Sequence, residues 1–148
     1  MFRAIIIAAC LFLAACSTSS MVHQAKPAEA KGPYGYKFEN YGGDDQVGIA
    51  NLDRLIKTTL RDAGVFVPGT EAPRIEITLT HFYVRSNGAR FWAGVMAGRD
   101  KISSRVRIVD AAGTQIAYFE VESTNATALG STGGLMEKHA NEILSRLQ

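Results

Sequence analysis

The pattern of apolar and polar positions along the chain predicts a domain of several strands and two helices. The clearest strand runs from Arg74 to Arg85, where side chains alternate with the period of two expected of a half-buried strand. One face of this predicted strand carries Ile75, Ile77, Leu79, His81 and Tyr83. We therefore expect His81 to be half-buried and hydrogen-bonded.

Three further segments show strand patterns. Aromatic residues alternate from Tyr34 to Tyr41, and two glycines then end the segment. Lys101 to Val109 and Thr114 to Glu122 read as a hairpin joined by a short turn.

The hairpin's apolar pattern also predicts its register. If Val109 pairs with Thr114, one face is mostly core and the other places Arg105 across from Tyr118. The predicted core face carries Ile102, Ser104, Val106, Ile108, Gln115, Ala117, Phe119 and Val121.

The first predicted helix has apolar residues at spacings of three and four from Ile49 to Ala63. Asp44 or Asp45 would cap its start, and Gly64 would close its end in the left-handed conformation.

The second predicted helix lies at the end of the chain, after a small, polar, glycine-rich loop. Ser131 or Thr132 would cap it, and His139 is assigned to its solvated side. Its apolar face carries Leu135, Met136, Ala140, Ile143, Leu144 and Leu147. Together the patterns predict an α+β fold, a mainly antiparallel sheet of four to five strands with two amphipathic helices on one face.

The start of the chain has the pattern of an export signal. Behind Arg3 the apolar run from Ala4 to Ala15 is shorter than the ~20 residues of a membrane-spanning helix, and small residues precede Cys16. This ending resembles the lipobox of bacterial lipoproteins, whose cysteine receives a lipid. We expect Cys16 to be the acceptor, because Cys10 lies too close to Arg3 for an apolar region of ~7–15 residues. An ordinary cleaved signal and an uncleaved anchor are the alternatives.

These features divide the chain into a signal peptide (1–15), a lipidated cysteine with a flexible tether (16–33) and one α/β domain (34–148). The net charge of +2 is too small to favour nucleic acid as a partner. The chain has two cysteines, Cys10 and Cys16, so the expected mature domain would have no thiol for a disulfide or a nucleophile.

The region from Arg74 to Gln148 resembles a bacterial lipoprotein family catalogued as domain of unknown function 4410. The matching features are the long strand, the glycine and aromatic loop from Gly88 to Gly98, the hairpin from Arg105 to Gly113, the Gly133-Gly134 pair and the closing helix. The resemblance implies a small periplasmic α/β domain, and Ser17 after the cysteine is consistent with outer-membrane sorting. It implies no activity, because the family is uncharacterised.

The most unusual stretch lies between Gly88 and Gly98 and holds Phe91, Trp92, Val95 and Met96. Each large apolar side chain would forgo roughly 1.5–3 kcal/mol if left in water. The stretch can pack on its own sheet, dock another protein or dip into a bilayer. The docking hypothesis makes these four residues a partner-binding patch.

The glycine-rich start of the last helix is a second candidate site. Backbone N–H groups of Ser131, Thr132, Gly133 and Gly134 could bind an anion at the positive end of the helix dipole. Ordinary helix capping is the simpler interpretation, because no P-loop lysine is present.

No motif indicates catalysis, a metal or a cofactor. The three histidines, His23, His81 and His139, have no second ligand at helical spacing, and no nucleophile has a named base. We therefore expect a non-enzymatic, lipid-anchored cell-envelope protein that binds an envelope protein partner. The alternative is a binder of a small or anionic envelope ligand in a cleft between the sheet and the Gly130 to Gly134 loop.

Overall fold

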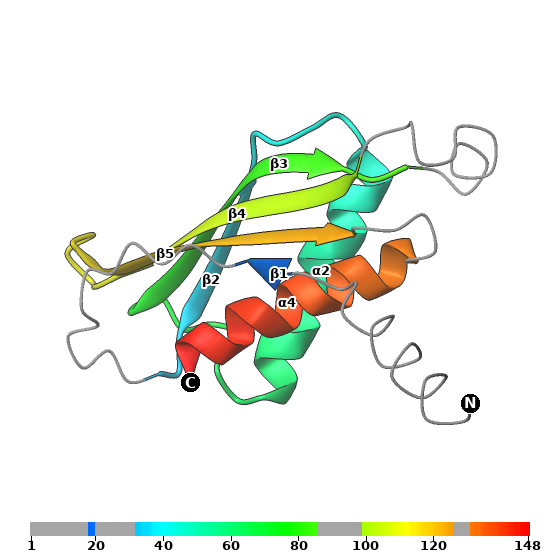
Figure 1. Cartoon of the computed structure of the whole chain (residues 1–148). Coiled ribbons are helices and arrows are strands. Elements are labelled where there is room, and N and C mark those ends of the chain that lie inside the picture. The colour runs from blue at the N-terminus through cyan, green and yellow to red at the C-terminus, as the bar shows by residue number, and fades with distance from the viewer. Residues whose placement is uncertain (1–17, 20–31, 86–98, 126–130) are drawn as a thin grey trace, which may run out of the picture.

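The computed structural model of the chain describes residues 18–19, 32–85, 99–125 and 131–148. Within them the elements are β1 (Thr18–Ser19), β2 (Gly35–Asn40), α2 (Gln46–Asp62), β3 (Arg74–Tyr83), β4 (Asp100–Val109), β5 (Gln115–Asn125) and α4 (Thr132–Leu147). The strands form one sheet in the order β1-β5-β4-β3-β2 (Figure 1). β2 and β3 are parallel, with α2 as their crossover, and the other neighbours are antiparallel.

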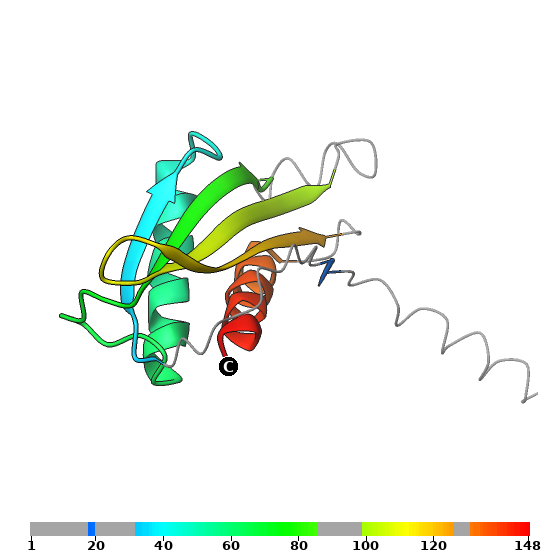
Figure 2. The same cartoon turned by 90° about the vertical axis from the view of Figure 1, so that its left-hand side faces the viewer.

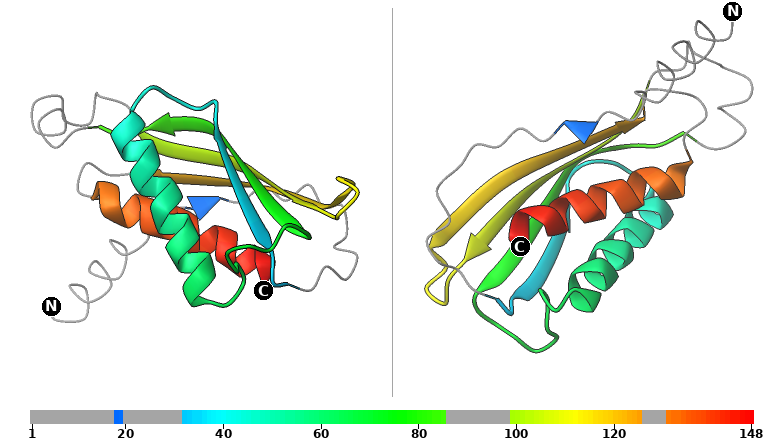
Figure 3. Two further views of the ribbon diagram at one scale, coloured as in Figure 1. Left: turned by 180° about the vertical axis from the view of Figure 1, so that it is seen from behind. Right: turned by 60° about the horizontal axis from the view of Figure 1, so that its bottom comes forward.

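Both helices cover the same face of the sheet. Figure 2 shows α2 and α4 side by side beneath the strands, and both views of Figure 3 agree. The predicted α+β fold with two helices on one face is confirmed. In the part of the chain that the structure describes, no helix covers the opposite face.

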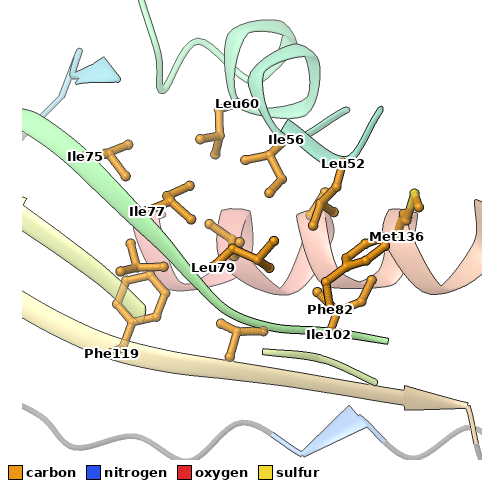
Figure 4. Close-up of a cluster of buried hydrophobic side chains, with 14 of the residues drawn as sticks. Leu52, Ile56, Leu60, Ile75, Ile77, Leu79, Phe82, Ile102, Phe119 and Met136 are labelled. Atoms are coloured by element: carbon orange, nitrogen blue, oxygen red, sulfur yellow. The ribbon is translucent and has the colours of Figure 1, made fainter. Parts of the chain in front are cut away.

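The core lies between the helices and the sheet. Leu52, Ile56 and Leu60 of α2 face the apolar side chains of β3, and all three are fully buried. Figure 4 shows them pointing toward Ile77 and Leu79, with α4 close behind. Leu135, Ala140 and Ile143 of α4 belong to the same core cluster. Apolar burial between these layers is the main stabilising term.

The helix ends follow the predicted capping chemistry. Oδ1 of Asp45 accepts a hydrogen bond from the N–H of Gly48 at 2.9 Å, so Asp45 is the cap of α2. Oγ of Ser131 accepts one from the N–H of Gly134 at 3.0 Å, so Ser131 caps α4. Gly64 follows α2 with a φ of 70°, as predicted for the closing glycine.

The predicted buried face of β3 is wrong beyond Leu79. The pairing with β4 shifts between Leu79 and His81, so one extra residue enters β3 and its side chains exchange faces. His81 is therefore exposed, Tyr83 is 48% exposed, and Phe82 joins the core at 7%. The prediction of a half-buried, hydrogen-bonded His81 is thus corrected.

The predicted register of the hairpin is wrong by two residues, although its faces are correct away from the turn. Arg105 lies opposite Glu120, and Arg107 opposite Tyr118. The carboxylate of Asp110 accepts hydrogen bonds from the N–H groups of Ala112 and Thr114, so Thr114 belongs to the turn. Because strand side chains alternate with a period of two, a two-residue shift leaves the side chains before Val109 and after Ile116 on their predicted faces. The pairing shifts again between Ile108 and Val109, and Gln115, which was predicted on the core face, is exposed.

The predicted signal peptide and the lipid acceptor Cys16 lie outside the described residues. So does most of the predicted tether, of which residues 18–19 and 32–33 are described. Thr18 and Ser19 form β1 and pair with Ser123 and Glu122 of β5.

Leu79→Ala is expected to lower the free energy of unfolding by ~2–5 kcal/mol, because it opens a cavity in a fully buried part of the core. Urea unfolding monitored by circular dichroism measures the loss. Val47→Ala, at a residue 74% exposed, is the matched control and should change stability little. Equal stability of the wild type and Leu79→Ala would contradict the assigned core.

Candidate functional site

The uncovered face of the sheet is lined by charged side chains in pairs. Nε of Arg105 lies 3.0 Å from Oε1 of Glu120, and Nζ of Lys101 lies 2.7 Å from Oε2 of Glu122. Both are cross-strand pairs between β4 and β5. Such partly exposed pairs add at most ~1 kcal/mol each to stability, so their larger effect is to hold charges in fixed positions.

Glu76 is the most constrained charge on this face. It is 8% exposed, and its carboxylate lies 2.6 Å from Nη2 of Arg74 and 2.7 Å from Nη2 of Arg107. The hydrogen bond from Arg74 lowers the pKa of Glu76, and the charge of Arg107 lowers it further. Glu76 therefore pairs with Arg74 within β3 and joins β3 to β4 through Arg107.

Tyr118 adds an aromatic ring to the cations and carboxylates of this face. Its hydroxyl donates to the carboxylate of Glu120, which also pairs with Arg105. We call the face formed by Glu76, Lys101, Arg105, Arg107, Tyr118, Glu120 and Glu122 the paired-charge face. Groups of this chemistry can form ion pairs and hydrogen bonds with a charged or polar partner.

His139 is fully buried, and its predicted solvated position is wrong. Nε2 lies 2.9 Å from Oγ of Ser104, and Nδ1 lies 2.9 Å from Oγ of Ser123. A neutral imidazole has one donor and one acceptor, and the two hydroxyls satisfy both. Burial lowers the pKa of His139 to about 3. His139 therefore joins α4 to β4 and β5 as a neutral group.

A salt bridge joins Arg85 to Asp100. Nε of Arg85 lies 2.8 Å from Oδ1 of Asp100, and the two side chains are 4% and 0% exposed. The backbone N–H of Arg85 donates to the same oxygen at 3.1 Å. The pair joins Arg85, just before residues 86–98, to Asp100, two residues after them. Removing one partner of such a buried pair lowers the free energy of unfolding by ~3–5 kcal/mol.

The predicted patch of Phe91, Trp92, Val95 and Met96 lies outside the described residues.

At the predicted anion site, the hydroxyl of Ser131 caps α4. Its Oγ accepts a hydrogen bond from the N–H of Gly134, as expected if Ser131, Thr132, Gly133 and Gly134 form an ordinary helix cap. Three hollows among the described residues have volumes of about 270, 360 and 530 Å³. None of the three is lined by Ser131 to Gly134.

Two kinds of site are absent from the described residues. They contain no group of three or more His, Cys, Asp or Glu side chains placed to hold a metal ion. None of the helices they form is both long enough and apolar enough to cross a membrane.

Acidification from about pH 6.5 toward pH 3 is expected to destabilise the fold through His139. Its pKa is 6.5 in the unfolded chain and about 3 when folded, so the unfolded chain takes up the proton first. Each pH unit in this window should lower the free energy of unfolding by up to ~1.4 kcal/mol.

Urea midpoints across this window measure the effect in the wild type, His139→Gln and the exposed control His81→Gln. The slope with pH should flatten in His139→Gln and stay at the wild-type value in His81→Gln. Identical slopes in the wild type and His139→Gln would contradict the buried neutral assignment.

Among the solved structures that share the fold are two of one protein. They are a PelC dodecamer from Paraburkholderia phytofirmans and a variant of that dodecamer, with 16% and 17% sequence identity and TM-scores of 0.62 and 0.63. Each alignment covers 88% of this chain and 98% of the PelC chain. At this identity the likeness shows the fold alone. No curated protein matches the chain.

A comparison with protein-family models relates this chain to a known family by sequence. The model described as a domain of unknown function (DUF4410) matches residues 49–128, which is more than half of the 148 residues. The match begins before Arg74, where the sequence resemblance starts, because it includes most of α2 as well as β3, β4 and β5. The chain belongs to the DUF4410 family.

Proposed function

We propose that this protein is a non-enzymatic cell-envelope lipoprotein whose domain is a protein-interaction or assembly module. Cys16 would anchor it in the outer membrane, facing the periplasm. Its first partners would be further copies of the same chain. The observation that carries this proposal is the paired-charge face, which the helices leave uncovered.

The paired-charge face suits recognition because its charges are already fixed. Arg105 is 59% exposed in its side chain and Glu120 is 38% exposed, yet both are held across adjacent strands. Side chains already held in ion pairs lose less conformational entropy on binding than mobile side chains do. Charges of both signs occur side by side, and such a pattern can be complementary to a second copy.

The PelC structures support self-assembly. Both are dodecamers, and their fold overlaps this chain over 98% of the PelC chain. Identical subunits assemble either through one self-complementary surface or through two different surfaces that fit each other. The net charge of +2 is small enough that copies of this chain would repel only weakly.

The internal chemistry supports a binding function over catalysis. His139 is enclosed between two serines, and Glu76 is held by two arginines. Side chains held in such contacts stabilise the packing of the helices and strands, and we propose no reaction for them.

Photo-crosslinking in cells tests the proposal. A photoreactive residue placed singly at Arg105 or Tyr118 should give a discrete adduct, and the same probe at Glu137, exposed on α4, is the control. A probe at Trp92 tests the patch predicted from the sequence in the same experiment.

An adduct at twice the chain mass from Arg105 or Tyr118 would support self-assembly, and an adduct of another discrete mass would identify a different envelope partner. Absence of any adduct from the probed positions, with normal abundance and folding of each variant, would contradict an interaction module. Adducts from Glu137 alone would contradict the assigned face.

A further inference from the structure

β1 is held near one end of the sheet. Thr18 pairs with Ser123, two residues before the last residue of β5. The same row of the sheet continues through Ile102 to Phe82 near the end of β3. The chain just after Cys16 is therefore attached at the β5 edge of the sheet, in the same row as the last residues of β3 two strands further on.

Chain length restricts where a lipid on Cys16 can be. Cys16 is two positions before Thr18, with Ser17 between them, and an extended chain spans at most ~3.3–3.6 Å per residue. The Cα atom of Cys16 therefore lies within about 7 Å of the Cα atom of Thr18. A lipid there would enter the bilayer beside this end of the domain.

The same end exposes three large apolar or amphipathic side chains. Tyr41 is 76% exposed, Val47 is 74% exposed and Tyr83 is 48% exposed. They follow β2, open α2 and end β3 respectively. Figures 1 and 3 show the start of α2 beside the end of β3.

Close backbone contacts hold these segments together. Gly42, next to Tyr41, accepts a hydrogen bond through its carbonyl from the N–H of Phe82 at 2.8 Å. A Cβ on Gly48 would lie 3.0 Å from the ring of Phe82, so the first turn of α2 rests on the end of β3.

We propose that Tyr41, Val47 and Tyr83 contact the surface of the lipid bilayer when Cys16 is acylated. The pairing of β1 with β5 would turn this end of the domain toward the membrane. Tyrosine suits that position because its ring is apolar and its hydroxyl remains hydrated at the headgroup level. The inference rests on the proposed lipidation of Cys16.

A depth measurement on the full lipidated protein in phospholipid vesicles tests this contact. An environment-sensitive fluorophore is attached to a single introduced cysteine in Val47→Cys, Tyr83→Cys or Val67→Cys. Val67 is the matched control, because it is a valine of 41% exposure beyond the opposite end of α2. Vesicles carrying a nitroxide on the lipid headgroup then quench labels that lie near the bilayer.

Quenching is expected to be several-fold stronger at positions 47 and 83 than at position 67. Equal quenching at the three positions, in protein that floats with the vesicles, would overturn the proposed contact while leaving the anchor intact. Thiol labelling of the chain without an introduced cysteine, or failure to float, would instead show that Cys16 is not acylated.

A second variant tests the role of β1 in orienting the domain. A flexible Gly/Ser insertion between Ser17 and Thr18 lengthens the connection without changing Cys16 or the domain. Quenching at position 47 should fall toward the level at position 67, with flotation unchanged. Full quenching at position 47 in this variant would overturn the orienting role of β1.

Discussion

Burial of one face of the sheet beneath α2 and α4 is the constraint on which the other features depend. Leu52, Ile56 and Leu60 supply the α2 side of that layer, and Leu135 and Ile143 the α4 side. The two helices of the described residues cover one face of this sheet, and the opposite face carries charged side chains. The strands use that face for cross-strand ion pairs, and these pairs become the candidate binding surface.

Two polar contacts inside the domain add geometric specificity to apolar packing that has little direction of its own. Ser104 and Ser123 fix His139 from two adjacent strands, which sets the position of α4 over β4 and β5. Arg85 and Asp100 join the ends of β3 and β4 through a buried pair. Each contact breaks and leaves a buried polar group unpaired if its elements move apart. Together the two contacts therefore disfavour other packings of the same apolar faces.

Local sequence patterns predicted the helices and strands, whereas the strand pairing and the buried polar contacts depend on residues far apart in the sequence. The caps Asp45 and Ser131 were predictable because capping chemistry lies within a few residues. His139 was placed wrongly because of its residue type, although its spacing of four from Leu135 and Ile143 already indicated the buried face. The bulge that exposes His81 and the Arg85–Asp100 pair depend on strand pairing, which has no local sequence signal.

The central claim is that the paired-charge face holds copies of this chain together. Sedimentation of the purified Cys16→Ser protein, lacking its predicted signal peptide, measures this most directly. The account predicts a discrete oligomer that dissociates in Arg105→Glu, where a cation of this face is reversed, and persists in Arg54→Glu on α2. A monomer at every concentration, or an oligomer unaffected by Arg105→Glu, would contradict it.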